Sequence, residues 1–223
     1  GTMNVSWDNH GRLVMGAPFG APSCGGPYSI DQYLRNSNVG GIITSQHQAF
    51  KHPKVFSIPL GIKEHKVDVL LNHMQSPIVP KTQLLMLNFQ VRAMREEPLK
   101  IILKNFPNLT NTFDDKTISL DYYQQIQSSK FDLTPTGMGW DSYRIWETLY
   151  MGAFPIIEHF NRTSVDGWFR VLEELPVLLV DTYAQITPQY LEDQYLRLVS
   201  KTYNWDRMTI GYWVELVESM VPK

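Results

Sequence analysis

The pattern of hydrophobic and polar positions becomes regular after about residue 80. Short apolar runs then alternate with segments of helical periodicity, and turn residues separate them. The pattern predicts strands at 84–89, 131–135, 154–158 and 177–181, and helices at 97–106, 120–129, 141–151, 165–174, 187–202 and 207–220. Strands that alternate with helices imply crossover connections. We therefore expect an α/β fold in which helices cover both faces of a parallel sheet.

The N-terminal part of the chain shows less periodicity. Its first forty residues are rich in Gly, Pro, Ser and Asn, which favours loops and short pieces. Apolar runs at 40–45 and 55–61 predict two strands, and a short helix is expected at 63–73. Because 75–81 has the composition of a linker, we predict a small N-terminal portion at 1–81 and an α/β domain at 82–223.

Composition limits the class of protein. The 223 residues are 43% hydrophobic and 12% aromatic, enough to build a full core. The formal net charge of −2 provides no basic field, so we expect no nucleic-acid partner. No run of about twenty apolar residues occurs, and no membrane span is expected.

The expected compartment follows from cysteine usage. Cys24 is the only cysteine, so the chain forms no disulfide of its own, which favours a cytoplasmic location. Sequons at Asn4, Asn108 and Asn161 keep an alternative open, in which the chain is a Golgi-lumenal fragment of a larger protein.

The loop and helix start after the strand at 131–135 carry the candidate chemistry. Gly137, Gly139, Ser142 and Arg144 would place backbone N–H groups, a hydroxyl and a guanidinium at the positive end of a helix, where an anion binds. Glu147, one turn deeper, could accept hydrogen bonds from a pair of sugar hydroxyls. Ligands of parallel sheets collect beyond the carboxyl ends of the strands, so this position suits a nucleotide-sugar site.

Each of these residues also has a purely structural interpretation. Arg144 and Glu147 could form an intrahelical ion pair worth about 0.3–0.5 kcal/mol. Asp141 or Ser142 could simply cap the helix. A second basic cluster follows the strand at 84–89, where Arg92 or Arg95 could reach the same diphosphate from a loop, or could belong to a solvated charge cluster.

The segment 131–156 resembles the donor-binding segment of exostosin-like glycosyltransferases of the GT-B class. The shared positions are Phe131, Leu133, Pro135, Gly137, Gly139, Asp141, Ser142, Arg144, Trp146, Glu147, Leu149, Gly152, Pro155 and Ile156. A weaker similarity covers about residues 84–200. The resemblance implies a Rossmann-like domain that binds a nucleotide-sugar donor, with a UDP-sugar favoured over a GDP-sugar, and a glycan or other hydroxyl acceptor.

The resemblance also implies roles for individual residues. Arg144 would contact the diphosphate and Glu147 the ribose hydroxyls. Arg95 matches an arginine that the family often has after the preceding strand. Retaining GT-B enzymes often carry two glutamates eight residues apart, and Gly139 stands where the first would be, which favours an inverting mechanism.

An inverting transfer needs a base to deprotonate the acceptor hydroxyl. We take His47, which follows the strand at 40–45, as the candidate, although its alternative is an ordinary surface or capping histidine. Other candidates are Asp8, His10, Asp31, His52, His65, Glu158 and His159. The chain has no Asp-x-Asp motif and no zinc-type spacing, so we expect neither a metal nor a cofactor.

A rival interpretation keeps the fold without the chemistry. A non-catalytic nucleotide- or carbohydrate-binding module would retain Arg144 and Glu147 but lack a working base. An epimerase or hydrolase on the same fold is a third possibility, because fold does not fix function.

Overall fold

The computed structural model describes residues 4–8, 13–16, 34–45, 53–77, 79–113, 120–137, 139, 141–159 and 166–220. The chain divides into two compact units. Unit 1 comprises Gly1–Pro59, Arg162–Leu175 and Asn204–Lys223, and unit 2 comprises Leu60–Asn161 and Pro176–Tyr203. Each unit is described by itself.

Unit 2 contains a parallel four-stranded sheet. Its strands are β5 (Gln83–Met86), β6 (Ser129–Leu133), β7 (Phe154–Glu158) and β8 (Leu178–Val180), in that spatial order. All neighbouring pairs are parallel. The predicted α/β class with a parallel sheet is therefore confirmed, and each of the four strands overlaps its predicted range.

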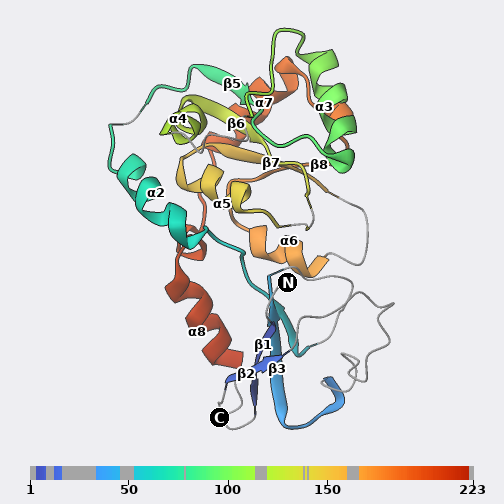
Figure 1. The fold of residues 1–223 in the computed structure, drawn as a ribbon, viewed down its shortest axis with the longest axis vertical. Helices are drawn as coiled ribbons and strands as arrows, with labels where there is room; N and C mark the ends of the chain where they lie inside the picture. The colour runs from blue at the N-terminus through green and yellow to red at the C-terminus, as the bar shows by residue number, and fades with distance from the viewer. Residues whose placement is uncertain are drawn as a thin grey trace. The chain divides into compact units, whose positions relative to one another are not determined.

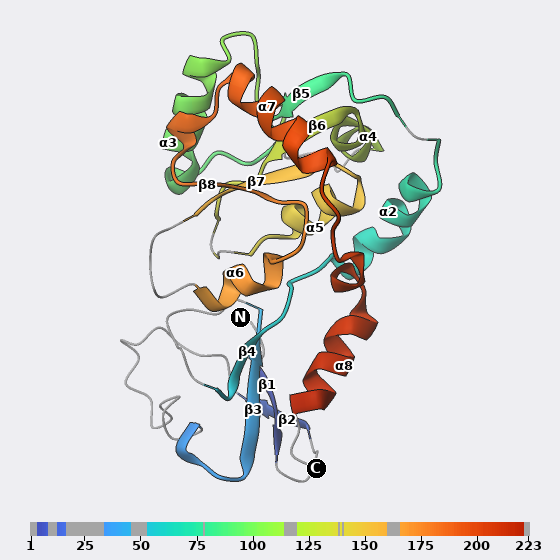
Figure 2. The same ribbon diagram turned by 180° about the vertical axis from the view of Figure 1, so that it is seen from behind.

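Helices cover both faces of this sheet (Figures 1 and 2). On one face, Ile102 of α3 (Ala93–Asn105) and Leu191 of α7 (Pro188–Val199) pack into a core cluster with strand residues such as Phe131. On the other face, α2 (Val67–Met74), α4 (Leu120–Ser128) and α5 (Tyr143–Tyr150) lie together. Their core cluster joins Leu70, Met86, Tyr123 and Ile126, among others.

The packing of α2 changes the predicted division of the chain. Leu70 of α2 is buried in the same cluster as Tyr123 and Ile126 of α4. The helix predicted at 63–73 is present as η1 (Glu64–Lys66) and α2, and it belongs to unit 2. The division thus differs from the predicted one: 75–81 lies within unit 2, and unit 1 includes the C-terminal helix.

α3 begins earlier than predicted, and this corrects the setting of Arg95. The sequence places a helix at 97–106 with Pro98 in its first turn, whereas α3 starts at Ala93 and has Pro98 inside it. Pro98 cannot donate a hydrogen bond to the carbonyl of Met94. Arg95 therefore lies on a helical turn and not in the predicted loop.

The other predicted helices are confirmed with small changes at their ends. Thr187 caps α7, since its Oγ1 accepts a hydrogen bond from the backbone N–H of Tyr190 at 3.2 Å. Among the described residues, no helix combines the length and apolar character that crossing a bilayer requires.

Unit 1 contains a mixed sheet whose strand order is β2-β1-β3-β4. β1 (Asn4–Asp8) pairs antiparallel with β2 (Leu13–Gly16) and with β3 (Val39–Thr44), and β3 pairs parallel with β4 (Val55–Ser57). β3 and β4 confirm the strands predicted at 40–45 and 55–61. The short strands β1 and β2 lie within the first forty residues, where the Gly- and Pro-rich sequence favoured loops and short pieces.

The described part of unit 1 also contains two longer helices. They are α6 (Asp166–Leu172) and α8 (Ile210–Met220), the latter preceded by the 3-10 turn η3 (Trp205–Met208). A small core cluster joins Leu34, Val39 and Ile42.

Candidate functional site

Arg95 joins α3 to the loop that leaves β6 at the carboxyl edge of the unit 2 sheet. Its Nε donates to the carbonyl of Thr136 at 3.1 Å, and its Nη1 donates to the carbonyl of Gln90 at 3.3 Å. The guanidinium also lies 6.0 Å from the ring centre of Phe89. Within the described residues no carboxylate forms an ion pair with Arg95. Its guanidinium contacts two carbonyl groups and the face of an aromatic ring.

Gly137 lets the loop approach this guanidinium. A Cβ atom built on Gly137 would lie 2.6 Å from Nη2 of Arg95, closer than real Cβ contacts. Glycine is thus required here if Arg95 is to keep its position. The loop is closed by a hydrogen bond from the N–H of Gly137 to the carbonyl of Gly139 at 3.2 Å.

Arg144, in the first turn of α5, brings a second cation to the same region. Burial lowers the pKa of Arg95, and the positive charge of Arg144 lowers it further. Arginine nonetheless stays protonated in proteins. Two adjacent cations at a sheet edge favour the binding of an anion.

The start of α5 leaves the Ser142 hydroxyl available. Ser142 occupies the N-cap position, but its side chain makes no capping hydrogen bond. Asp141 instead accepts hydrogen bonds from the N–H of Leu60 at 2.7 Å and from Nε1 of Trp146 at 2.8 Å, so its carboxylate fixes the loop. Ser142 therefore stands at the predicted N-cap position, but the predicted capping hydrogen bond is made by neither Ser142 nor Asp141.

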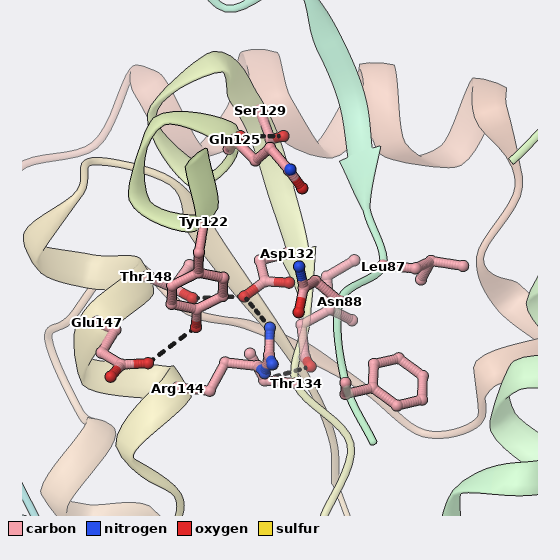
Figure 3. Close-up of polar contacts among 12 residues, drawn as sticks. Leu87, Asn88, Tyr122, Gln125, Ser129, Asp132, Thr134, Arg144, Glu147 and Thr148 are labelled. Carbon is pink, nitrogen blue, oxygen red and sulfur yellow. Dashed lines mark hydrogen bonds and ion pairs between the residues drawn. The ribbon is translucent and has the colours of Figure 1, made fainter. Parts of the chain in front are cut away.

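The partner of Arg144 is Asp132 on β6, a residue that the sequence patterns did not single out (Figure 3). Phe131 and Leu133 belong to the core cluster on the α3 and α7 face. Asp132, between them, points to the opposite face, where its Oδ2 lies 3.6 Å from Nη1 of Arg144. The same oxygen accepts a hydrogen bond from Oγ1 of Thr148 at 2.7 Å.

Burial dominates the chemistry of Asp132, which is 0% exposed. Loss of solvation raises the pKa of this carboxyl to about 6, although Arg144 and the hydrogen bond from Thr148 act to lower it. An ionisable side chain inside an apolar strand was the sequence signal that could have identified this residue.

Glu147 is buried too, and its carboxylate already has protein partners. Lys66 of η1 donates to Oε1 at 2.8 Å, and Tyr122 of α4 donates to Oε2 at 2.8 Å. Tyr123 makes a longer contact of 3.4 Å with Oε1. Burial raises the pKa of Tyr122 well above its usual value, so its phenol donates. In place of the possible Arg144–Glu147 ion pair, Arg144 pairs with Asp132 and Glu147 pairs with Lys66. The binding of ribose by Glu147 stays a prediction.

Tyr122 also connects the two pairs. The guanidinium of Arg144 lies 5.3 Å from the centre of the Tyr122 ring, whose hydroxyl contacts Glu147 (Figure 3). No sequence signal pointed to Lys66, because it lies 81 positions before Glu147.

Arg95, Gly137, Gly139, Ser142, Arg144 and Glu147 from the sequence prediction all lie in unit 2, and their role in donor binding stays a prediction. The candidate base His47 lies outside the described residues. Glu158 and His159 stand at the end of β7, and burial raises the pKa of Glu158. Within the described chain, no three His, Cys, Asp or Glu side chains are grouped as a metal site would require.

A family model described as the RXYLT1 C-terminal domain matches residues 94–210, more than half of the 223 residues. The match includes Arg95, Asp132, Arg144 and Glu147, whereas Lys66 precedes it. RXYLT1 is a xylosyltransferase, a member of the glycosyltransferase class. The chain therefore belongs to the RXYLT1 C-terminal domain family, which is related to glycosyltransferases.

Proposed function

We propose that this protein is a glycosyltransferase that moves a sugar from a nucleoside-diphosphate sugar to an acceptor hydroxyl. One observation carries the proposal: the Arg95 guanidinium lies against Gly137 at the carboxyl edge of a parallel sheet, and Arg144 follows in the first turn of the next helix. Diphosphate oxygens would be bound by these two guanidinium groups, the N–H group of Gly139 and the Ser142 hydroxyl. The family match and the resemblance to exostosin-like GT-B enzymes support the same assignment.

The reaction would be a single displacement. The acceptor oxygen forms a bond to the anomeric carbon while the bond from that carbon to the β-phosphate oxygen breaks. The nucleoside diphosphate leaves with the electron pair, and the acceptor proton passes to a base, for which His47 remains our candidate. Arg95 and Arg144 would stabilise the charge of the leaving group without a metal, and the configuration of the sugar would be inverted.

The nucleoside half of the donor would extend toward Glu147. Ribose hydroxyls can donate to its carboxylate only where Lys66 or the tyrosines yield their positions. We expect a UDP-sugar, and because the family is named after a xylosyltransferase, UDP-xylose is the first donor to test.

Thermal-shift and calorimetric titrations with UDP, UDP-xylose, GDP, ADP and CMP test the donor site. A ligand that binds the folded state raises the melting temperature by mass action. We expect UDP and UDP-xylose to raise it, and we expect Arg95→Met and Gly137→Ala to weaken their binding about tenfold or more. The added methyl group of Gly137→Ala must push the Arg95 side chain away from the loop.

Arg92→Met provides the matched control. Arg92 lies three residues before Arg95 but is exposed at the start of α3, so its loss should leave affinity nearly unchanged. A folded protein that binds none of the nucleotides would contradict the proposal. Binding that is accompanied by neither sugar transfer to an acceptor nor hydrolysis of the donor would instead favour the non-catalytic module.

A further inference from the structure

The ion pair between Asp132 and Arg144 is incompletely satisfied. Its shortest described contact is 3.6 Å, longer than the roughly 2.7–2.9 Å of a good charge-assisted hydrogen bond. Oδ1 of Asp132 and Nη1 of Arg144 are both buried and have no hydrogen-bond partner among the described residues. Thr148 satisfies only Oδ2. A buried carboxylate with one bare oxygen is costly to keep ionised.

Among the described residues, Asp132 is the carboxylate that forms an ion pair with Arg144. The titratable groups that face Asp132 are Arg144 and Glu147 on α5 and Tyr122 on α4. Glu147 is neutralised by Lys66 at 2.8 Å, and Tyr122 is a neutral donor to Glu147. An anion that binds Arg144 therefore competes with Asp132 for one guanidinium.

We propose that Asp132 is a displaceable counter-ion: it holds Arg144 in the ligand-free protein, and it takes up a proton from solvent when the donor diphosphate takes over the guanidinium. This inference rests on the proposed function, because it assumes that the anion at Arg144 is the diphosphate of a nucleotide sugar. Thr148 would keep the carboxyl group in place in both states, since its hydroxyl can donate to either form.

The direction of the linkage follows from electrostatics. A diphosphate close to Asp132 disfavours the ionised carboxylate, so it raises the pKa of this group further above its ligand-free value of about 6. Binding must then be tighter at low pH, where the proton is already present. If Asp132 served only to hold Arg144 in a binding-competent position, protonation would weaken binding instead.

Calorimetric titration of UDP-xylose between pH 5.5 and 8 distinguishes these cases. A nucleotide sugar is the suitable probe, because the terminal phosphate of UDP itself titrates at about pH 6. We expect wild-type affinity to rise about tenfold as the pH falls, which corresponds to one pKa unit. Buffers of different ionisation enthalpy should reveal uptake of a fraction of a proton on binding, a result that needs no variant.

Asp132→Asn and Asp141→Asn form the comparison. Asp132→Asn should bind the probe about tenfold more tightly at pH 8 and should lose both the pH dependence and the proton uptake. Asp141 is also a buried carboxylate, in the loop that follows β6, and its hydrogen-bond partners include Leu60 and Trp146. Asp141→Asn should therefore retain the proton uptake of the wild type.

Three results would overturn the inference. They are binding by the wild type without proton uptake, weaker binding by a folded Asp132→Asn variant, and loss of proton uptake in Asp141→Asn as well. Failure of the wild type to bind UDP-xylose or any other nucleotide sugar is a different result, because it overturns the proposed function together with the inference.

Discussion

Asp132 and Glu147 are both acidic and both buried, yet their surroundings differ. The carboxylate of Glu147 accepts from an ammonium group and two phenols. Asp132 accepts one hydroxyl hydrogen bond and lies at 3.6 Å from a guanidinium. Because so few donors compensate its lost hydration, Asp132 favours its protonated form more in the folded protein than in the unfolded chain.

This difference predicts how the free energy of unfolding depends on pH. The pKa of Asp132 is about 6 in the folded protein against 3.8 as its ordinary value, so the folded state binds more protons between these limits. Its contribution to stability is fully present below about pH 4 and is lost as the pH rises to about 6. Two pKa units correspond to roughly 3 kcal/mol.

Urea unfolding at pH 4, 5, 6 and 7 measures this contribution. The free energy of unfolding of the wild type, minus that of Asp132→Asn, should fall across this range, because other carboxylates contribute equally to both proteins. A constant difference between the two proteins would contradict the assigned shift.

α5 shows what the sequence could predict about an element and what it could not. The apolar spacing predicts the helix at 141–151, with Trp146, Leu149 and Tyr150 facing the core. The helix is confirmed, and Trp146 and Leu149 are buried, whereas Tyr150 is half-buried. The partners of its polar side chains were not predictable, because they come from β6 and from η1, far along the chain. Local patterns report which face of a helix is apolar, whereas long-range ion pairs depend on how the elements pack.

The pair between Lys66 and Glu147 ties η1 to α5 and should contribute strongly to stability. Their side chains are 14% and 3% exposed. Lys66→Met would leave Glu147 buried without its counter-ion, a loss of about 3 kcal/mol or more. We expect chemical denaturation to show this decrease.

Lys130 and Glu192 provide the comparison for that variant. Their contact of 2.6 Å is at least as short, but the side chains are 22% and 47% exposed. Water and salt screen this pair, so Lys130→Met should cost less than about 1 kcal/mol. Equal losses in the two variants would show that burial does not set the strength of the Lys66 pair.

At the scale of the whole chain, the sequence predicted two parts but did not predict which segments belong to each part. A linker-like composition at 75–81 suggested one boundary, whereas unit 1 is assembled from three separate segments. Composition describes only neighbours in sequence. Contacts such as that of Arg207 with the end of α6, which join segments more than thirty residues apart, decide which segments fold together.

Arg207 offers a test of how far the two units depend on each other. Its buried guanidinium donates to the carbonyl of Glu173 at 2.9 Å and to that of Arg170 at 3.1 Å, and its own carbonyl accepts from Trp213 at 2.7 Å. Arg207→Met removes two charged hydrogen bonds at a helix C-terminus and should cost about 2 kcal/mol or more. Arg197 is exposed on α7, so Arg197→Met is the control and should leave the melting temperature nearly unchanged.

The nucleotide affinity of the same variant tests the location of the site. The contacts of Arg207 lie in unit 1, whereas the residues proposed to hold the diphosphate lie in unit 2. Arg207→Met should therefore lower the melting temperature while its affinity for UDP-xylose, measured well below the unfolding transition, equals that of the wild type. A parallel loss of affinity would mean that donor binding requires an intact unit 1, and that residues beyond unit 2 contribute to the site.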